Sequence, residues 1–322
     1  MRAIVLRETG GPEVLRLEEV PPPVPGPGEV LVRTEAVGVS YYETPLRAGV
    51  FPFPAPLPAV FGFEAAGTVT EVGEGADAAL LGRRVTVMKL GGTGGTYAEY
   101  VAAGADALTL VPAGVSAADA VATAVQGAVA LTLLRAAALE DGQTVLIEVA
   151  GGGVGGYLTQ LVRGFGAGRV LATAGSEVKR RRARDLGADL VLDHTDPSWP
   201  DQVREAGGTV DVVFEAIGGA SARRLLDAMT PGGGRMMFYG LLDGPPEVTP
   251  VDLLHRGLTL AGCGGLAAWG RHVQDARAEV LDMVADGRLR PQVDSVLPLA
   301  DAATAHRRIE ERAAIGKIVL VP

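Results

Sequence analysis

A run of glycines between residues 151 and 156 has the spacing of a phosphate-binding loop. The segment 144–161 reads TVLIEVAGGGVGGYLTQL, so a β-prone stretch precedes the glycines and a helix-like stretch follows them. A strand that enters such a loop and a helix that leaves it bring backbone N–H groups and a helix dipole to one point, which suits a pyrophosphate. Overlapping G-x-G-x-x-G and A-x-G-x-x-G patterns both fit, and a tight turn in another α/β protein is the alternative. The predicted contacts with a dinucleotide are Gly152, Gly153, Val154 and Gly155.

The segment after the next predicted strand bears on which dinucleotide is bound. An Asp or Glu about twenty residues beyond the glycine loop would bind the ribose 2′-hydroxyl of NAD and repel a 2′-phosphate. The sequence has ATAGS at 172–176 in that place, followed by a basic run. It therefore predicts NADPH, while Glu177 leaves open a carboxylate contact with the ribose hydroxyls. The predicted partners of the 2′-phosphate are Ser176, Lys179 and Arg180.

The elements that hold this loop follow from the hydrophobic pattern. From residue 121 to 261, short apolar runs such as VDVVFEAIG alternate with helix-like segments. This alternation predicts right-handed βαβ units and a doubly wound, mostly parallel Rossmann sheet. Residues 1–120 are rich in β-branched and turn residues, which predicts a β-rich antiparallel domain, and 269–287 predicts an amphipathic helix. The expected fold class is therefore α/β, with a doubly wound sheet and a separate β-rich domain.

Net charge limits the classes of partner. The 322 residues carry a formal charge of −9, with a pI near 5.1. A nucleic-acid-binding protein or a polybasic membrane-surface protein needs a broad positive face. We therefore expect no nucleic acid and no membrane among the partners.

Cysteine content and the apolar segments indicate the compartment. Cys263 is the only cysteine, which excludes an intrachain disulfide and a multi-thiolate metal site. The first residues have the pattern of a strand and not of a secretory signal. The most apolar window, 117–139, is interrupted by Asp119, Gln126, Gly127 and Arg135, so we predict a buried helix pair there. Together these features predict a cytoplasmic protein.

Motifs along nearly the whole chain resemble one protein family. The opening MRAIVLRETGGPEVL, the glycine-containing FGFEAAGTVTEVGEG, the segment GTYAEYV and the ending GKIVLVP occur in family order around the glycine loop. The chain resembles the medium-chain dehydrogenase/reductase superfamily, in its zinc-independent quinone oxidoreductase branch. The resemblance implies a GroES-like catalytic domain from residues 1–120 and 262–322 and a Rossmann domain from 121–261. It also implies a cofactor and substrate cleft between them and a homodimer joined through the last Rossmann strand, near 258–262.

Metal ligands of the zinc-dependent relatives are not found at the matching positions. Those relatives carry Cys at the position of Ser40 and a His-Glu pair at Phe63 and Glu64. We therefore predict no metal. Without a Lewis acid, simple alcohol dehydrogenation loses its usual support, and reduction of an activated, conjugated acceptor becomes the favoured reaction.

The resemblance also implies particular site residues. A polar residue near the nicotinamide falls on Ser40, and Tyr41 or Tyr42 could donate a proton, with aromatic packing as the alternative for each tyrosine. Phe51, where enoyl reductases of the superfamily carry a tyrosine, and Phe53 are expected to line the substrate pocket. Further expected contacts with the cofactor are Gln126, His194, Phe238, Gly240, Cys263, Gly264 and Lys317. Core packing is the alternative for Gln126, and an exposed position on a strand is the alternative for Lys317.

Three functions are compatible with these residues. The first is an NADPH-dependent reductase of a quinone or other small, apolar, conjugated enone. The second is an enoyl reductase acting on an acyl thioester or a polyketide intermediate, although Phe51 replaces the phenol expected there. The third is a non-catalytic NADPH-binding protein. The aromatic residues expected around the cleft favour an enzyme.

Overall fold

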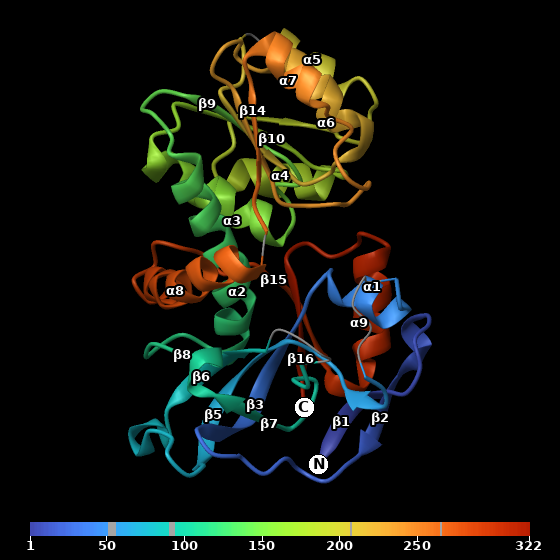
Figure 1. The fold of residues 1–322 in the computed structure, drawn as a ribbon, viewed down its shortest axis with the longest axis vertical. Coiled ribbons are helices and arrows are strands. Elements are labelled where there is room, and N and C mark those ends of the chain that lie inside the picture. The colour runs from blue at the N-terminus through green and yellow to red at the C-terminus, as the bar shows by residue number, and fades with distance from the viewer. Residues whose placement is uncertain (51–55, 90–93, 207, 265) are drawn as a thin grey trace. The chain divides into compact units, whose positions relative to one another are not determined.

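Two compact units make up the chain (Figure 1). The computed structural model describes residues 1–50, 56–89, 94–206, 208–264 and 266–322. The first unit contains Met1–Val125 and Arg277–Pro322, and the second contains Gln126–Ala276. We predicted boundaries after residues 120 and 261, whereas residues 262–276 belong to the second unit. The difference arises because two long helices, α2 (Ala117–Ala137) and α8 (Leu266–Ala285), each run through a boundary.

Antiparallel pairing dominates the first unit. Its larger sheet has the order β15-β16-β3-β5-β6-β8, with β7 paired to β3, and its smaller sheet has the order β2-β1-β4. Only β15 and β16 pair in parallel within these sheets. The strands of the larger sheet are β3 (Glu29–Val39), β5 (Glu64–Val72), β6 (Arg84–Met88), β7 (Tyr100–Gly104), β8 (Leu108–Leu110), β15 (Val293–Pro298) and β16 (Lys317–Val321). Those of the smaller sheet are β1 (Arg2–Leu6), β2 (Leu15–Glu19) and β4 (Ala59–Val60).

Apolar side chains from both sheets form the core of this unit, and helices pack against it. Buried residues of β1, β3, β5, β6 and β16 pack with the aromatic rings of Phe61, Phe63 and Tyr97. The helices α1 (Glu43–Ala48) and α9 (Ala302–Glu310) are linked by an ion pair between buried Arg47 and Glu310. This link holds the short α1, and with it the segment that follows Ser40, in a fixed position.

The second unit contains the predicted parallel sheet. All its strand pairs are parallel, in the order β11-β10-β9-β12-β13-β14. Numbered along this unit, the order is 3-2-1-4-5-6, that of a doubly wound dinucleotide-binding sheet. The predicted fold class is therefore confirmed. The strands are β9 (Thr144–Ile147), β10 (Arg169–Thr173), β11 (Leu190–Leu192), β12 (Val212–Glu215), β13 (Arg235–Phe238) and β14 (Thr259–Gly262).

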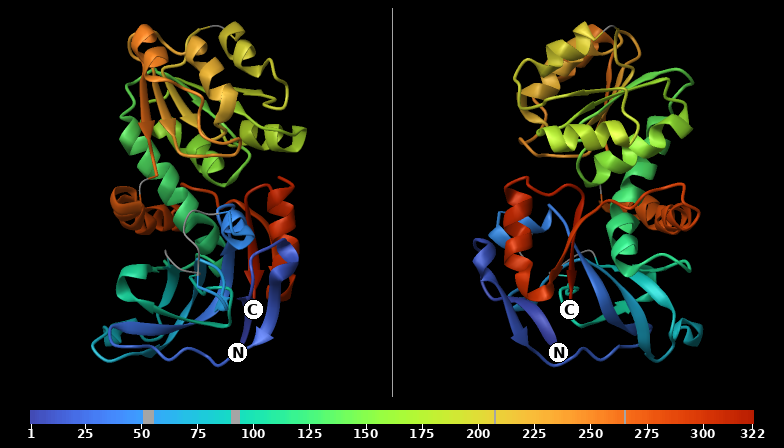
Figure 2. Two further views of the ribbon diagram at one scale, coloured as in Figure 1. Left: turned by 45° about the vertical axis from the view of Figure 1, so that its right-hand side comes forward. Right: turned by 180° about the vertical axis from the view of Figure 1, so that it is seen from behind.

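Helices cover both faces of this sheet (Figures 1 and 2). Figure 1 shows α5, α6 and α7 on one face and α3 and α4 on the other. On the first face, Trp199 and Leu225 pack against Leu171 and Val213 of the strands. The helices are α3 (Gly153–Leu161), α4 (Glu177–Asp185), α5 (Trp199–Glu205), α6 (Gly219–Leu225) and α7 (Pro250–Arg256).

The apolar helix α2 is one continuous helix of 21 residues, so the predicted helix pair is wrong. Gly127 lies in its interior without breaking it, because a single glycine in a helix costs only about 1 kcal/mol relative to alanine. Among the residues that the structure describes, α2 alone is long and apolar enough to cross a membrane, and 67% of its most apolar stretch is buried inside the protein. Such burial is typical of a core helix.

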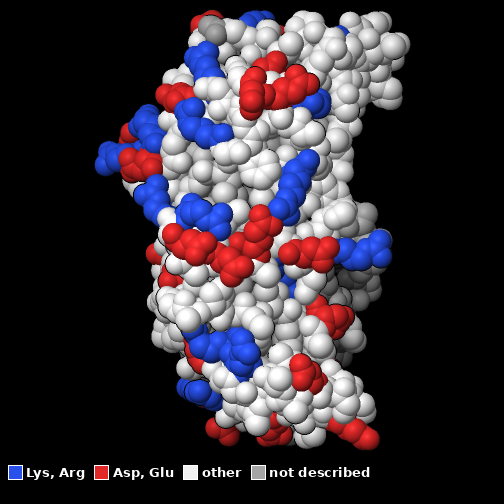
Figure 3. Space-filling view, turned by 90° about the vertical axis from the view of Figure 1, so that its left-hand side faces the viewer, with Lys and Arg blue, Asp and Glu red and all other residues white. Residues whose placement is uncertain are grey.

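Charged side chains of both signs are mixed on the face of the molecule that Figure 3 shows. On the face drawn in Figure 3, Lys and Arg side chains lie next to Asp and Glu side chains. A protein that binds a phosphate backbone needs clustered positive charge instead. The expectation of no nucleic-acid partner remains a prediction.

Candidate functional site

The glycine loop joins β9 to α3 at the carboxyl edge of the parallel sheet. Gly152 caps α3 with an extended backbone and no side-chain hydrogen bond, so the first N–H groups of the helix have no side-chain cap. A Cβ on Gly151 would lie 2.6 Å from Cβ of Lys179, and a Cβ on Gly155 would overlap the carbonyl oxygen of Val149. These two glycines are therefore required by packing within the protein. The uncapped N–H groups at the start of α3 fit the pyrophosphate of a dinucleotide.

Gln126, a predicted neighbour of the cofactor, lies beside this loop. A Cβ built on Gly153 would meet Cγ of Gln126 at 3.1 Å, so the side chain of Gln126 covers the first turn of α3. Gly153 can therefore be replaced only if Gln126 moves. Val154, which we also predicted to contact the dinucleotide, lies in the same first turn.

The residues after β10 are held by local hydrogen bonds. Ser176 caps α4, because its side chain accepts a hydrogen bond from the N–H of Lys179 at 3.4 Å. Arg180 is bound by two carboxylates, since its Nε donates to Glu177 at 3.1 Å and its Nη1 donates to Asp193. His194 lies over Gly175, where an added Cβ would be 2.6 Å from Nε2. The structure thus brings Ser176, Lys179 and His194 to one end of the sheet, while Arg180 already has anionic partners.

The loops after β13 and β14 lie side by side at the same edge. The N–H of Cys263 donates to the carbonyl oxygen of Phe238 at 2.7 Å, and a Cβ on Gly240 would lie 2.5 Å from the carbonyl oxygen of Ala216. Burial raises the pKa of the Cys263 thiol to about 11, so this thiol is a weak nucleophile at neutral pH. Gly264, the next residue, is exposed.

The first unit holds a buried cluster of charged groups around Ser40. Lys317 is 4% exposed, and its Nζ donates to Ser40 Oγ at 2.9 Å and to Glu64 Oε1 at 3.0 Å. Ser40 Oγ in turn donates to Glu64 Oε1. The ammonium of Lys317 is directed at Ser40, and the approach of Lys317 to the cofactor stays a prediction. The arrangement places a cation and a carboxylate on one hydroxyl, which suits the hydroxyl for proton transfer.

A second group of buried residues supports this cluster. Glu43 is fully buried and accepts hydrogen bonds from the N–H of Ser40 at 2.7 Å, the Tyr97 hydroxyl at 2.7 Å and the N–H of Phe63 at 3.2 Å. Burial raises the pKa of Glu43 to about 8 against these hydrogen bonds. The Tyr97 hydroxyl also lies 3.2 Å from Nε2 of His306. Burial, with a smaller contribution from Arg47, lowers the pKa of His306 to about 3.

The two tyrosines next to Ser40 differ in their surroundings. The ring of Tyr42 packs against Phe63, with ring centroids 4.8 Å apart, and burial raises the pKa of its phenol, with Glu43 and Glu64 adding to the rise. Tyr41 is 47% exposed. The packing of Tyr42 matches the aromatic-packing alternative for that residue. Phe51 and Phe53, the expected lining of the substrate pocket, lie outside the described residues.

The residues around Ser40 do not fit a zinc ion. A serine hydroxyl and the ring of Phe63 stand where zinc-dependent relatives carry ligands, and Phe63 is 2% exposed in the apolar core. Zinc prefers thiolate, imidazole and carboxylate ligands. The ammonium of Lys317 lies 3.0 Å from the Glu64 carboxylate and would repel a second cation. No step of the chemistry is therefore assigned to a metal.

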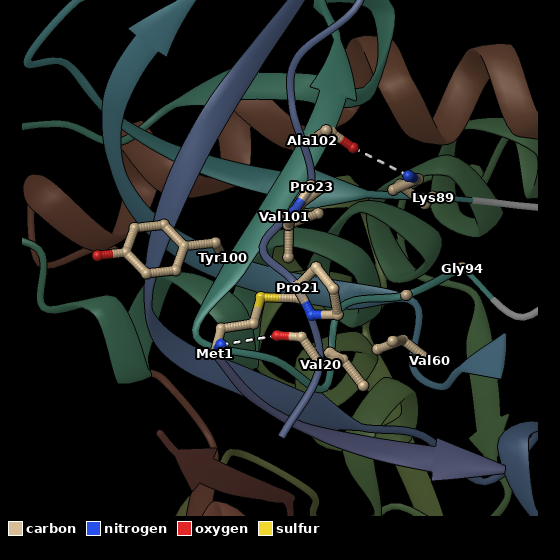
Figure 4. Close-up of a pocket in the computed structure, with 11 residues that line it drawn as sticks. Met1, Val20, Pro21, Pro23, Val60, Lys89, Gly94, Tyr100, Val101 and Ala102 are labelled. Atoms are coloured by element: carbon tan, nitrogen blue, oxygen red, sulfur yellow. Dashed lines mark hydrogen bonds between the residues drawn. The ribbon is translucent and has the colours of Figure 1, made fainter. Parts of the chain in front are cut away.

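A pocket of about 290 Å³ lies elsewhere in the first unit (Figure 4). Its lining is mostly apolar, and its charged groups are engaged with backbone carbonyls: Lys89 Nζ donates to Ala102 at 2.9 Å and the N-terminal ammonium donates to Val20 at 2.7 Å. None of the predicted site residues lines it. The pocket therefore offers little to orient a polar substrate.

Several residues of these clusters were missed at the level of sequence. Glu64 was considered only as a possible zinc ligand, and Glu43, Tyr97 and the buried Arg277 were not singled out. Burial lowers the pKa of Arg277 to about 10, and its Nη2 donates to the carbonyl oxygen of Ala107 at 3.2 Å. A signal was present for Glu64, because FGFEAAG places a charged residue in an otherwise apolar strand pattern. Such a residue is rarely buried without a partner.

Comparison with known proteins places this geometry in context. Residues 26–113 match the alcohol dehydrogenase GroES-like domain, and residues 186–320 match a family described as zinc-binding dehydrogenase. A quinone oxidoreductase of Sus scrofa is 33% identical, and the alignment covers 100% of this chain and 98% of that protein. A solved NAD-dependent alcohol dehydrogenase is 33% identical, with a TM-score of 0.90 and full coverage of both chains. The Escherichia coli quinone oxidoreductase complexed with NADPH is 28% identical, with a TM-score of 0.88 and full coverage of both chains.

Proposed function

Because the chain belongs to the medium-chain dehydrogenase/reductase superfamily, in its quinone oxidoreductase branch, and is therefore an oxidoreductase, we propose that it reduces a quinone or another conjugated enone with NADPH. The observation that carries the proposal is the pair of hydrogen bonds from Lys317 to Ser40 and Glu64. They supply a buried proton source where metal-dependent relatives supply a Lewis acid. A conjugated acceptor is the substrate that such a site can reduce without a metal.

The protein's part in this reaction is to hold and move a proton. When bound, NADPH supplies a hydride, and the electron pair displaced within the acceptor moves onto its carbonyl oxygen. Ser40 turns its hydroxyl from Glu64 to that oxygen and gives up its proton, and an N–H of Lys317 replaces the proton on Ser40 Oγ. Glu64 stabilises the Lys317 ammonium until the reaction begins. Lys317 then regains its proton from water, so that one hydride and one proton are added to the acceptor in each turnover.

Steady-state consumption of nicotinamide cofactor tests the proposal. We expect the purified protein to oxidise NADPH with 1,4-naphthoquinone or 9,10-phenanthrenequinone, and more slowly with cyclohexenone, because a quinone stabilises the added electrons best. Crotonyl thioester in the same panel tests the alternative enoyl reductase. Turnover of the thioester alone would replace the quinone or enone by an enoyl thioester as the substrate class. If NADPH is oxidised with none of the acceptors, the proposal of a reductase of this class is contradicted.

The preference for NADPH is also a proposal, supported by the residues after β10. Ser176 and Lys179 lie at the end of that strand, where the ribose of a bound dinucleotide is expected. Glu177 and Asp193 would oppose a 2′-phosphate if they were free, but both bind Arg180. Lys179, in the first turn of α4 that Ser176 caps, is the cation that we assign to the 2′-phosphate.

Replacing Lys179 by Ala is expected to raise KM for NADPH about tenfold and to change KM for NADH less than twofold, because one charge-assisted hydrogen bond contributes about 1.5 to 3 kcal/mol. Alanine keeps the Cβ that packs over Gly151, so the loop should be retained. Arg181→Ala, an exposed basic residue of the same helix, is the matched control. Equal effects of Lys179→Ala on both cofactors would remove Lys179 from phosphate recognition.

We also propose a homodimer joined along β14. This strand is an edge of the parallel sheet, so its outer N–H and C=O groups can pair with those of a second copy. Light scattering of the eluted protein should give twice the mass of the 33.1 kDa chain, and a monomeric mass would reject the dimer.

A further inference from the structure

Two buried carboxyl groups meet at the carboxyl edge of the parallel sheet. Glu148 directly follows β9 and Glu215 ends β12, and the N–H of Glu148 donates to the carbonyl oxygen of Phe214 at 3.1 Å. Both residues are 0% exposed. The strands β9 and β12 are neighbours at the point where the strand order reverses, which is where open α/β sheets bind their ligands. The catalytic roles proposed above use neither carboxyl group.

The pair holds the loop that follows β12. Glu148 Oε2 accepts hydrogen bonds from the N–H groups of Ala216 at 2.8 Å and Ile217 at 2.9 Å. Glu215 Oε1 accepts a hydrogen bond from the N–H of Gly218. Three successive amides of the loop 216–219 therefore depend on these two side chains.

The other oxygen of each carboxyl group points to a shared proton. Glu148 Oε1 and Glu215 Oε2 are buried, and neither accepts a hydrogen bond from a donor among the described residues. The two residues directly follow the paired residues Ile147 and Phe214 of adjacent parallel strands, so the side chains lie at the same edge of the sheet. Two ionised carboxylates buried side by side would repel each other in a medium that cannot screen them, whereas one proton between them satisfies both oxygens.

The charged surroundings favour the same assignment. Burial, with the neighbouring Glu215 charge, raises the pKa of Glu148 well above its ordinary value, and burial also raises the pKa of Glu215. The other titratable group that the pair affects is Tyr239, which follows β13; burial and both carboxyl groups raise the pKa of its phenol. Asp243, in the next loop, lies against Gly219.

The loop 216–219 in turn holds the loop that follows β13. The N–H of Asp243 donates to the carbonyl oxygen of Ile217 at 2.7 Å, and the N–H of Gly219 donates to that of Pro245 at 3.1 Å. A Cβ on Gly218 would overlap the carbonyl oxygen of Gly244, so the two loops are in direct backbone contact. A shift of the carboxyl pair would therefore move both loops at this edge.

We propose that Glu148 and Glu215 share one proton at neutral pH, and that the protonated pair positions the loop 216–219 for binding of the nicotinamide cofactor. The second part rests on the proposed function, because it requires the cofactor to bind at this edge. Glu148 is thus a positioning residue that acts through the loop. When the shared proton is lost to water at higher pH, the two like charges repel and the loop loses its anchor.

Cofactor affinity as a function of pH tests this proposal. We expect the Kd for NADPH, measured by its fluorescence, to rise at least fivefold between pH 7 and pH 9.5. In Glu148→Gln the change should be less than twofold, because the amide accepts from the loop and donates permanently to Glu215. Glu148→Leu should bind at least tenfold more weakly at both pH values. Glu205 is an exposed glutamate at the end of α5, and Glu205→Gln should show the same change of Kd with pH as the unmodified protein.

Thermal unfolding without cofactor separates the two parts of the proposal. Between pH 7 and pH 9.5, the Tm of the unmodified protein should fall more than the Tm of Glu148→Gln. Equal falls in Tm would overturn the shared proton. A Tm difference accompanied by equal pH dependence of Kd in both proteins would overturn the positioning role. If neither NADPH nor NADH binds at any pH, the proposed function fails, while the melting comparison still decides the shared proton. If Glu148→Gln does not fold, Glu215→Gln places the amide on the other strand for the same comparisons.

Discussion

Lys317→Met should lower kcat for quinone reduction about 100-fold or more and leave KM for NADPH nearly unchanged, because loss of a positioned proton source typically costs 10²- to 10⁴-fold. In the folded protein, Lys317 Nζ donates to Ser40 Oγ at 2.9 Å, and methionine offers no N–H to replace the serine proton. Stability should also fall by about 3 to 5 kcal/mol, since Glu64 is left buried without its cation. Steady-state kinetics and urea unfolding measure the two effects.

A double variant distinguishes proton transfer from structural support. Lys317→Met combined with Glu64→Gln removes the uncompensated charge of Glu64. The double variant should therefore regain most of the lost stability, while its kcat stays as low as that of Lys317→Met. Recovery of turnover in the double variant would show that the single variant failed through structure, and the role of Lys317 in proton transfer would be rejected. Lys89→Met is the matched control, because Lys89 is a partly buried lysine of the same unit whose Nζ donates to the backbone carbonyl of Ala102.

The second large effect is expected at Glu43. Glu43→Ala should destabilise the protein by about 4 kcal/mol, because it leaves the N–H groups of Ser40 and Phe63 and the Tyr97 hydroxyl buried without an acceptor, at about 1 to 3 kcal/mol each. Glu43→Gln keeps an acceptor oxygen and should lose less than half as much. Urea unfolding at pH 6 measures the difference, with exposed Glu8→Ala as the control. Equal losses in both variants would show that the acceptor oxygen is not what matters.

Glu43 should also make stability depend on pH in a defined direction. Burial raises its pKa from 4.5 to about 8 in the folded protein, so the folded state binds the proton more tightly than the unfolded state. The stabilisation linked to this proton is complete below pH 4.5 and is lost as pH rises through about 8, at about 1.4 kcal/mol per pKa unit. The free energy of unfolding should therefore fall between pH 5 and pH 8.5 more steeply in the unmodified protein than in Glu43→Gln. Parallel curves would contradict the assignment.

His306 should make stability depend on pH in the opposite direction. Its pKa is lowered to about 3 in the folded protein, so its stabilisation is complete above pH 6.5 and is lost as pH falls toward 3. Stability should therefore be greatest at intermediate pH, where His306 is neutral and Glu43 has not lost its proton. Glu43 and His306 both contact the hydroxyl of Tyr97. The same part of the core should therefore lower the free energy of unfolding at high pH and at low pH.

Local patterns in the sequence were sufficient to predict the fold class and the position of the glycine loop. Strand and helix alternate with fixed periods, and a strand-glycine-helix junction is contained in about twenty consecutive residues. Each of these features depends on near neighbours, so it can be interpreted without knowing where the rest of the chain lies. The absence of zinc ligands at Ser40 and Phe63 is of the same kind, because it depends on residue identity alone.

The partners of charged side chains were decided only by the tertiary structure. Lys317 reaches Ser40 across 277 positions of sequence, because β16 pairs with β3 and brings the two strand ends together. Glu148 meets Glu215 because the parallel order of β9 and β12 aligns their ends. Arg180, predicted to bind phosphate, is paired with Asp193 beyond the next strand. A charged side chain has a long reach and no periodic pattern of its own, so its partner follows from sheet register and burial, which the sequence specifies only through the folded chain.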